Sequence, residues 1–401
     1  MKKRFSPWKY RLVFSWTLTF TLSVLITGCW DYHELDEESI ISMFAYDITP
    51  SNLLQASAYL QKPIQNSGNS DNGGGKSDKP EILQSTGTSM YEAIKNMSMY
   101  SPNQLAFHHH IITILSEKFA RSDNFGDGLE RITRVGGTRR RGLFAVTSGN
   151  AVDVLRLKLP LVDNLAQGLY SLTEASAEQQ FSLKVDLNDV LYDLTTTGIE
   201  PIVPRIVLKP NKLQRNGKLE VKLFGCGAFR GTHLVGWLSG TETRGVLWLR
   251  HKTGHAILRF PWKDGNMIVQ TEEIKVKIIP PKRITRINKR LLFQIQTQWK
   301  GKIVMYTGHR ILSIQDIPSI KKGIDNHIKL ILERSIKRAQ TLHTDVIGFG
   351  NTLYCAYPSL YRQHYLDDWD TVYFPKITYS IQVKAKVHSI GLTNHYPEDG
   401  R

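Results

Sequence analysis

The uncharged stretch of residues 12–30 limits where the rest of this chain can fold. Serines and threonines interrupt its apolar residues, and a membrane-spanning helix needs about 20 mainly apolar residues, so the stretch makes a poor permanent anchor. No acidic residue precedes it, whereas five basic residues do: Lys2, Lys3, Arg4, Lys9 and Arg11. A basic start followed by a short apolar run is typical of a secretory signal peptide, so we expect export.

The stretch ends in Ile26-Thr27-Gly28-Cys29. An aliphatic residue, two small residues and a cysteine in this order resemble a bacterial lipobox. Small side chains admit a peptidase to the bond before Cys29, and the thiol becomes the thioether that carries diacylglycerol. We therefore predict a lipoprotein signal peptide over residues 1–28 and lipidation of Cys29. Two acyl chains anchor stably where one is marginal, so the body should be tethered outside the cytoplasmic membrane. An uncleaved anchor with an incidental cysteine is the alternative.

The mature body is basic. The whole chain has a net charge of +16, from 52 basic and 36 acidic residues, and removal of the signal peptide with its five basic residues leaves about +11. Such a charge suits contact with an anionic surface. The densest basic cluster, Arg139–Arg141, is too short for a nucleic-acid-binding arm, so no nucleic-acid partner is predicted.

Length and composition indicate several domains. The chain has 401 residues, 41% of them hydrophobic, which is enough for two or three cores. Prolines at positions 201, 204 and 210 interrupt the pattern of alternating helices and strands. We predict the α+β class: three mixed α/β-sheet domains with largely antiparallel strands, after the signal peptide. The predicted domains are an N-terminal domain (29–205), a middle domain (206–265) and a C-terminal domain (266–401).

The N-terminal domain begins with two predicted strands, at residues 40–48 and 53–60. A stretch without apolar side chains follows at residues 66–80, and then a helix with a capping box of Ser89 and Glu92. Further strands are predicted at 111–115 and 143–147, with helices at 129–135, 152–157 and 161–172, and a last helix capped by Asp186.

The middle domain is predicted as two strands, KLEVKLFGCGAF and HLVGWL, and a helix capped by Ser239 and Glu242. Another strand, HAILRF, follows. In the C-terminal domain the alternation predicts strands at 267–279, 290–299 and 303–307 and a final strand at 377–387. Between them lies a long helix whose apolar stripe should pack on a sheet: Ile317, Ile320, Ile324, Ile328 and Ile331.

Four segments partly match motifs for catalysis, a cofactor or a metal, but none has the full pattern that the chemistry needs. GGGKS lacks the first glycine of a phosphate loop, because that position is Ser70. His108–His110 precede a strand, where adjacent side chains point to opposite faces and do not converge on one metal. Ser319 and Lys322 match SxxK only within the periodicity of the long helix. Asp367, Asp368 and Asp370 share one loop with no further sign of a catalytic pair. We therefore predict no enzymatic activity, no cofactor and no metal site.

Only Cys226 and Cys355 remain after Cys29, and they lie in different predicted domains. We interpret them as two separate buried thiols. A disulfide between them is the alternative, because two cysteines are enough to form one.

Three segments together resemble a known family: GCWDYHELDE (28–37), LFGCGAFRGTHLVGWLSGTETRGVLWL (223–249) and DVIGFGNTLYCAYP (345–358). They resemble the C-subunit lipoproteins of bacterial spore germinant receptors, the Ger(x)C family, in order and spacing from Cys29 to about residue 392. One departure is Tyr361, where the family usually has tryptophan.

The resemblance implies a non-enzymatic receptor subunit with a three-domain α+β body on the outer face of the inner spore membrane. Its implied partners are two integral-membrane subunits, an A-type subunit and a permease-like B-type subunit. It supplies one defined site residue, Cys29. The alternative from another class is an extracytoplasmic solute-binding lipoprotein of a transporter, which would need a pocket-sized apolar cleft with convergent polar groups.

Overall fold

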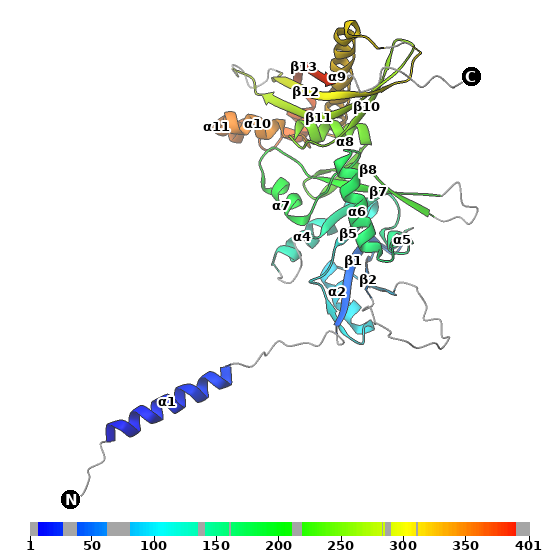
Figure 1. Ribbon diagram of the computed structural model, residues 1–401. Coiled ribbons are helices and arrows are strands. Elements are labelled where there is room, and N and C mark those ends of the chain that lie inside the picture. The colour runs from blue at the N-terminus through cyan, green and yellow to red at the C-terminus, as the bar shows by residue number, and fades with distance from the viewer. Residues whose placement is uncertain are drawn as a thin grey trace, which may run out of the picture.

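The computed structural model describes residues 7–26, 38–61, 81–134, 141–159, 162–210, 219–282, 284, 290–309 and 312–389. Within these ranges the strands form two sheets, and helices pack on both (Figure 1). The predicted α+β class is confirmed. Of the eleven pairings between strands six are antiparallel and five are parallel, so the sheets are more evenly mixed than expected.

The first sheet has nine strands in the order β3-β2-β1-β5-β6-β7-β8-β9, with β4 beside β1. Its strands are β1 (Glu38–Ile48), β2 (Leu54–Leu60), β3 (Glu81–Gly87), β4 (Gln104–Ala106), β5 (Ile112–Ser116), β6 (Leu143–Thr147), β7 (Ile202–Pro210), β8 (Leu219–Arg230) and β9 (His233–Leu238). The second sheet has the order β10-β11-β12-β13: β10 (Ile257–Trp262), β11 (Gly265–Ile279), β12 (Leu292–Tyr306) and β13 (Thr378–Ser389).

The helices are α1 (Pro7–Ile26), α2 (Met90–Met97), α3 (Glu117–Ala120), α4 (Asn124–Arg134), α5 (Ala151–Leu155), α6 (Leu165–Glu178), α7 (Leu187–Thr195), α8 (Gly240–Leu249), α9 (Ile317–Thr341), α10 (Phe349–Ala356) and α11 (Pro358–His364). The predicted N-caps Ser89, Asp186 and Ser239 each accept a backbone N–H in the first turn of their helix. These local signals were sufficient because a cap depends on residues three positions apart.

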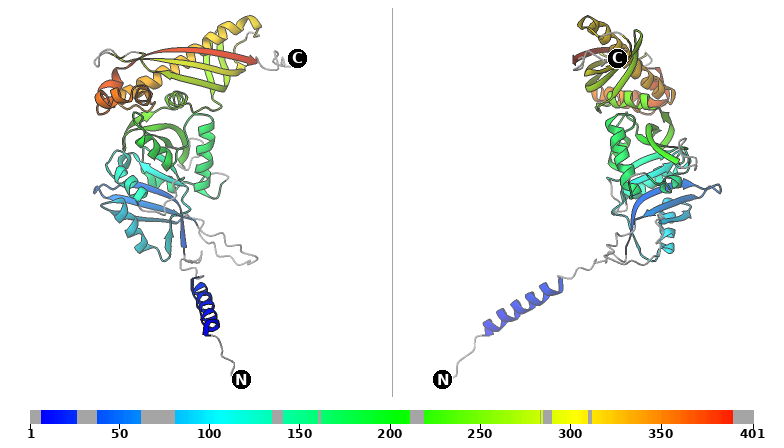
Figure 2. Two further views of the ribbon diagram at one scale, coloured as in Figure 1. Left: turned by 90° about the vertical axis from the view of Figure 1, so that its left-hand side faces the viewer. Right: turned by 45° about the vertical axis from the view of Figure 1, so that its right-hand side comes forward.

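Helices cover both faces of the first sheet. Successive side chains of each strand point to opposite faces, so neighbouring residues enter different cores. On β1, Met43 and Ala45 pack with α5 and α6, whereas Phe44 and Tyr46 face the core that contains α2, α3 and α4. That second core continues past α8 into the second sheet. Figure 2 shows the resulting stack, with the second sheet at one end of the body.

Helix α8 lies between the two sheets. Gly245 brings it close to α9, because a Cβ at this position would lie 2.0 Å from Ser335 Oγ. The stripe on α9 is confirmed for Ile320, Ile324, Ile328 and Ile331, all buried. The predicted boundaries fall inside β7 and at the start of β11, and the division into three domains stays a prediction.

The prediction of two strands at 290–299 and 303–307 is wrong. The structure has one strand, β12, which continues through residues 300–302 with an irregular register beside Thr271 and Glu273 of β11. A Cβ on Gly301 would lie 2.2 Å from the carbonyl oxygen of Gln270. The glycine therefore permits close strand contact and does not reverse the chain.

Candidate functional site

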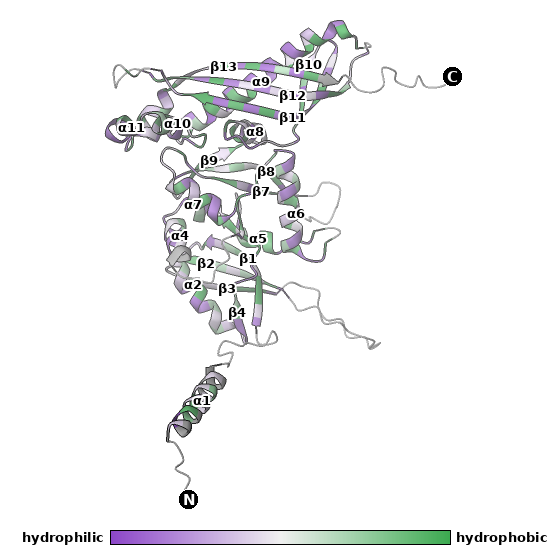
Figure 3. Ribbon diagram, turned by 60° about the vertical axis from the view of Figure 1, so that its left-hand side comes forward, coloured by the Kyte–Doolittle hydropathy of each residue, from purple (hydrophilic) through white to green (hydrophobic). Residues whose placement is uncertain are grey.

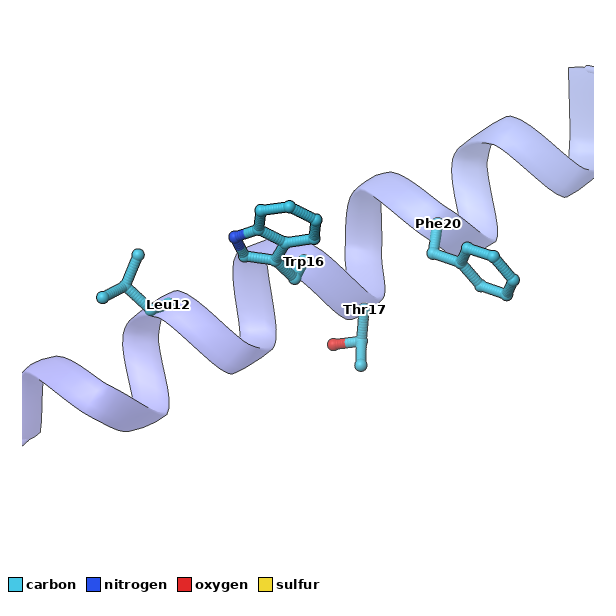
Figure 4. Close-up of a pocket in the computed structure, with 4 residues that line it drawn as sticks. All are labelled: Leu12, Trp16, Thr17 and Phe20. Atoms are coloured by element: carbon cyan, nitrogen blue, oxygen red, sulfur yellow. The ribbon is translucent and has the colours of Figure 1, made fainter.

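The predicted lipidation site, Cys29, lies outside the described residues, and so does the predicted loop 66–80. The helix before Cys29, α1, carries exposed aromatic residues such as Trp16, and its hydroxyls donate to its own carbonyls, for example Thr21 to Thr17 at 2.8 Å. No described helix is long and apolar enough to cross a membrane. Figure 4 shows a depression along α1 lined by Leu12, Trp16, Thr17 and Phe20. Because all four belong to one helix, we interpret it as a surface feature and not as a site.

The candidate site is a buried polar junction at the DVIGFG segment, between the two sheets. Asp345 is fully buried, and its carboxylate accepts four hydrogen bonds. Three donors are the backbone N–H groups of Ile347 (3.2 Å), Gly348 (2.8 Å) and Gly350 (2.7 Å), and the fourth is Nε1 of Trp369 (2.9 Å). Asp345 therefore satisfies the donors at the start of α10, which is the role of an N-terminal cap.

The glycines of this segment have a geometric reason. Gly348 has a φ of +96°, a left-handed conformation that strains other residues. A Cβ on Gly350 would lie 2.6 Å from Nε1 of Trp369. The backbone can close around Asp345 because both positions lack a side chain.

Two more acidic residues reach the junction from other parts of the chain. The backbone N–H of Asp345 donates to Oδ1 of Asp370 (2.5 Å), and the N–H of Glu200 donates to the carbonyl of Asp345 (3.1 Å). The Glu200 carboxylate accepts the N–H of Gly231, in the turn between β8 and β9, at 2.6 Å. Segments up to about 170 residues apart along the chain thus meet at Asp345.

Arg250, at the C-terminal end of α8, fastens the junction to α7. Its Nη1 lies 2.8 Å from Oδ2 of Asp193, and only 6% of the Arg250 side chain is exposed. Its Nε donates to the carbonyl of Val346 at 2.5 Å, and Nη2 donates to the carbonyl of Glu200. One guanidinium therefore connects α7, α8, the segment before β7 and the DVIGFG segment.

Burial raises the pKa values of all three junction carboxyls. The pKa of Asp345 is raised by burial, against the effect of the donors that it accepts. Burial, with the nearby charges of Asp345 and Glu200, raises the pKa of Asp370 to about 7. The pKa of Glu200 is raised mainly by burial and by Asp345. The negative charge of Glu200 beside Asp370 favours the protonated form of Asp370.

This arrangement predicts stability that falls as pH rises. Unfolded carboxyls titrate near pH 4, whereas the pKa of Asp370 is about 7 in the folded chain, so the folded state binds more protons between these two values. We expect the free energy of unfolding to decrease by roughly 4 kcal/mol across this window, because the pKa of Asp370 rises from near 4 to about 7 and each unit is worth about 1.4 kcal/mol. Glu200→Gln should flatten the slope in chemical denaturation at several pH values. Asp367→Asn, at an exposed neighbouring carboxyl, should leave it unchanged. Equal slopes for wild type and Glu200→Gln would refute the assignment.

A cavity of about 440 Å³ adjoins the junction. Leu249, Ile278 and Ile347 supply apolar lining, and Lys252 and Lys277 are exposed at it. The charged groups deepest in it, Arg250 and Asp193, are paired with each other. Because these groups are satisfied within the protein, they are poorly placed to select a ligand.

The other residues considered from the sequence lie apart from the junction. His108 and His109 are exposed, and His110 is buried, with Nδ1 3.4 Å from the carbonyl of Phe107. Ser319 Oγ donates to the carbonyl of Asp316 at 2.9 Å. Of the aspartates at 367, 368 and 370, the first two are exposed, and Asp370 belongs to the junction.

Both later cysteines are free thiols in the structure. Burial raises the pKa of Cys226 to about 12, which leaves its thiol without nucleophilic character near neutral pH. Cys355 is exposed on α10, so the prediction that it is buried is wrong. On the same helix Leu353 is buried, two positions before Cys355, so the two side chains lie on different sides of α10.

The fold and the junction define an α+β protein of two joined sheets without a recognisable catalytic constellation in its described part. Residues 31–208 match the spore germination protein N-terminal domain, and residues 225–391 match the spore germination B3/GerAC like C-terminal domain. The chain belongs to the Ger(x)C family of spore germination proteins.

Relatives from Bacillus subtilis (strain 168) match over nearly their whole length. Spore germination protein KC is 25% identical over 396 residues, 93% of this chain and 94% of the relative. Spore germination protein B3 is 23% identical over 94% of this chain and 97% of the relative. The crystal structure of the GerBC protein is similar with a TM-score of 0.54 at 17% identity, covering 86% of this chain and 96% of that chain. At this identity, the structural likeness concerns the fold.

Proposed function

We propose that the chain is a non-enzymatic, lipid-anchored subunit of a spore germinant receptor, needed for the germination response. The observation that carries this proposal is the match of both halves to domains of spore germination proteins. The lipobox that ends at Cys29 supports anchoring, because two acyl chains hold a protein stably at a bilayer. The proposed location is the outer face of the inner spore membrane.

The proposed partners are the A-type and B-type membrane subunits of the same receptor. Confinement to one membrane raises the effective concentration of such partners, so each contact can be weak in solution. The basic charge of the body after Cys29, about +11, adds attraction to anionic surfaces.

The buried junction supports a role in transmitting a signal through the body. Asp345, Arg250 and Glu200 tie α7, α8 and α10 together by direct hydrogen bonds. These hydrogen bonds, together with the core that continues past α8, hold the two sheets in a fixed relation. Burial raises the pKa of the Cys226 thiol to about 12, so this buried cysteine does not supply a nucleophile near neutral pH.

The second candidate is a solute-binding lipoprotein, which the cavity of about 440 Å³ favours by its size. Titration calorimetry of residues 30–401 with amino acids, nucleosides and sugars separates the two. The coupling role predicts no saturable binding tighter than roughly millimolar, because the polar groups at the base of the cavity are already paired. Saturable binding at roughly micromolar concentration would favour the solute-binding protein, and Tyr192→Ala at the cavity rim would then be expected to weaken it.

A further inference from the structure

The second sheet has one covered face and one open face. On the covered face, Phe260 packs against His327 of α9 with ring centroids 5.5 Å apart, and Phe293 packs against Phe349 of α10 at 4.9 Å. Burial alternates from residue to residue along β12, and Figure 3 shows the matching alternation of hydropathy along these strands. The exposed positions of β11, β12 and β13 therefore lie on the face opposite these helices.

Lysine and glutamine dominate that open face, which we call the lysine face. Each of the three strands contributes two lysines at alternate positions, all exposed: Lys275, Lys277, Lys300, Lys302, Lys384 and Lys386. Lys277, near the end of β11, also borders the cavity beside the junction. Exposed glutamines lie among them at Gln294, Gln296, Gln298 and Gln382. The exposed acidic residues of β11 are Glu272 and Glu273, so the face is strongly positive.

The strand register brings these charges together. Lys300 is directly opposite Lys386, and Lys384 is opposite Gln298, on strands that lie about 4.8 Å apart. Like charges in opposite positions destabilise a sheet. Glu273 of β11 is directly opposite Lys300 and forms an ion pair with Lys275 at 2.8 Å, so it relieves part of the repulsion. Among the described residues Lys384 and Lys386 have no such partner. A bound anionic group would remove the remaining repulsion.

An apolar margin adjoins the lysine face. Ile257 on β10 is 55% exposed, and Val304 and Met305 on β12 are 51% and 47% exposed. The register places Met305 beside Ile268, which continues this margin across the sheet. Apolar area next to charged side chains suits a protein as the binding partner better than a wholly hydrophilic polymer. The described outward positions of β11–β13 carry no aromatic ring, so the face lacks the stacking platform that nucleic-acid bases use.

The position of the face argues against the membrane as its partner. In Figures 1 and 2, β1 starts at the end of the body opposite the second sheet, and Cys29 precedes β1 in the chain. We propose that the lysine face docks a carboxylate-rich segment of a protein partner. The argument against the membrane as the partner depends on the proposed anchoring at Cys29. The charge and the strand register of the lysine face are independent of that anchoring.

Binding of a poly-L-glutamate peptide to the full chain tests this proposal by fluorescence anisotropy at low salt. The test variant combines Lys300→Gln, Lys384→Gln and Lys386→Gln. The control variant removes the same charge elsewhere, through Lys95→Gln, Lys158→Gln and Lys209→Gln, all at exposed positions. We expect the dissociation constant to rise roughly tenfold in the test variant and less than about twofold in the control. Circular dichroism should show both variants folded like wild type.

Two results would overturn the proposal. The first is an equal loss of peptide binding in the test and control variants, which would mean that only total charge matters. The second is a stronger dependence on the same three lysines for polyphosphate or for vesicles with phosphatidylglycerol than for polyglutamate, which would assign the face to phosphate or to a membrane. Peptide binding is measured without a receptor. Failure of the anchoring proposal would therefore appear separately, as membrane attachment that does not need Cys29.

Discussion

Replacement of Asp345 by alanine is expected to lower the free energy of unfolding by about 3–5 kcal/mol. The change leaves three backbone N–H groups and Nε1 of Trp369 without their acceptor in a fully buried place. Each unsatisfied buried donor costs about 1–3 kcal/mol, and local rearrangement will recover part of the sum. Chemical denaturation of the purified body measures the change.

Asp367→Ala is the matched control, because this aspartate is exposed in the same loop as Asp370. Its cost should stay within about 0.5 kcal/mol, as for ordinary surface substitutions. Asp345→Asn should also destabilise, since its amide group presents donors to backbone donors. A cost below about 1 kcal/mol for Asp345→Ala would show that the junction is not a structural centre. In spores, the same variant should weaken the germination response even though its lipobox is intact.

The local elements were predictable because their signals are local. The short apolar run at 143–147 predicted β6, the segment at 233–238 predicted β9, and the periodicity of isoleucines predicted the buried side of α9. The three N-caps were predictable for the same reason, since side chain and backbone donor lie within one turn.

The junction was not predictable, because its members are far apart in the sequence. Glu200 and Asp370 belong to different predicted domains, and only the folded chain brings both to Asp345. The proline at position 201 indicated a domain boundary, and no local motif marked the neighbouring Glu200 as part of a buried site. Arg250 follows a helix whose apolar residues indicate only packing against the core. Nothing near Arg250 in the sequence indicates that Asp193 is its partner.

The lysine face shows the same division between local and long-range information. The alternate lysines of each strand can be found in the sequence, for example Lys384 and Lys386. The parallel pairing of β12 with β13, which places Lys300 opposite Lys386, depends on the crossover through α9 and cannot be read from either strand.

A lipid on Cys29 is proposed to hold this body at a membrane. Each buried methylene contributes about 0.8 kcal/mol, so two acyl chains keep nearly all of the protein membrane-bound. Cys29→Ala removes the thiol that would carry them. Cys355→Ala is the matched control, because it removes an exposed thiol on α10 with no predicted lipid.

Fractionation of spores that also lack the A-type and B-type subunits measures the tether alone, since no receptor partner can then retain the protein. We expect wild type and Cys355→Ala to sediment with the membranes, and Cys29→Ala to move to the soluble fraction or to be lost from the spore. In spores that contain the partners, we expect Cys29→Ala to reduce the germination response. Membrane attachment of Cys29→Ala as complete as that of wild type would contradict the account.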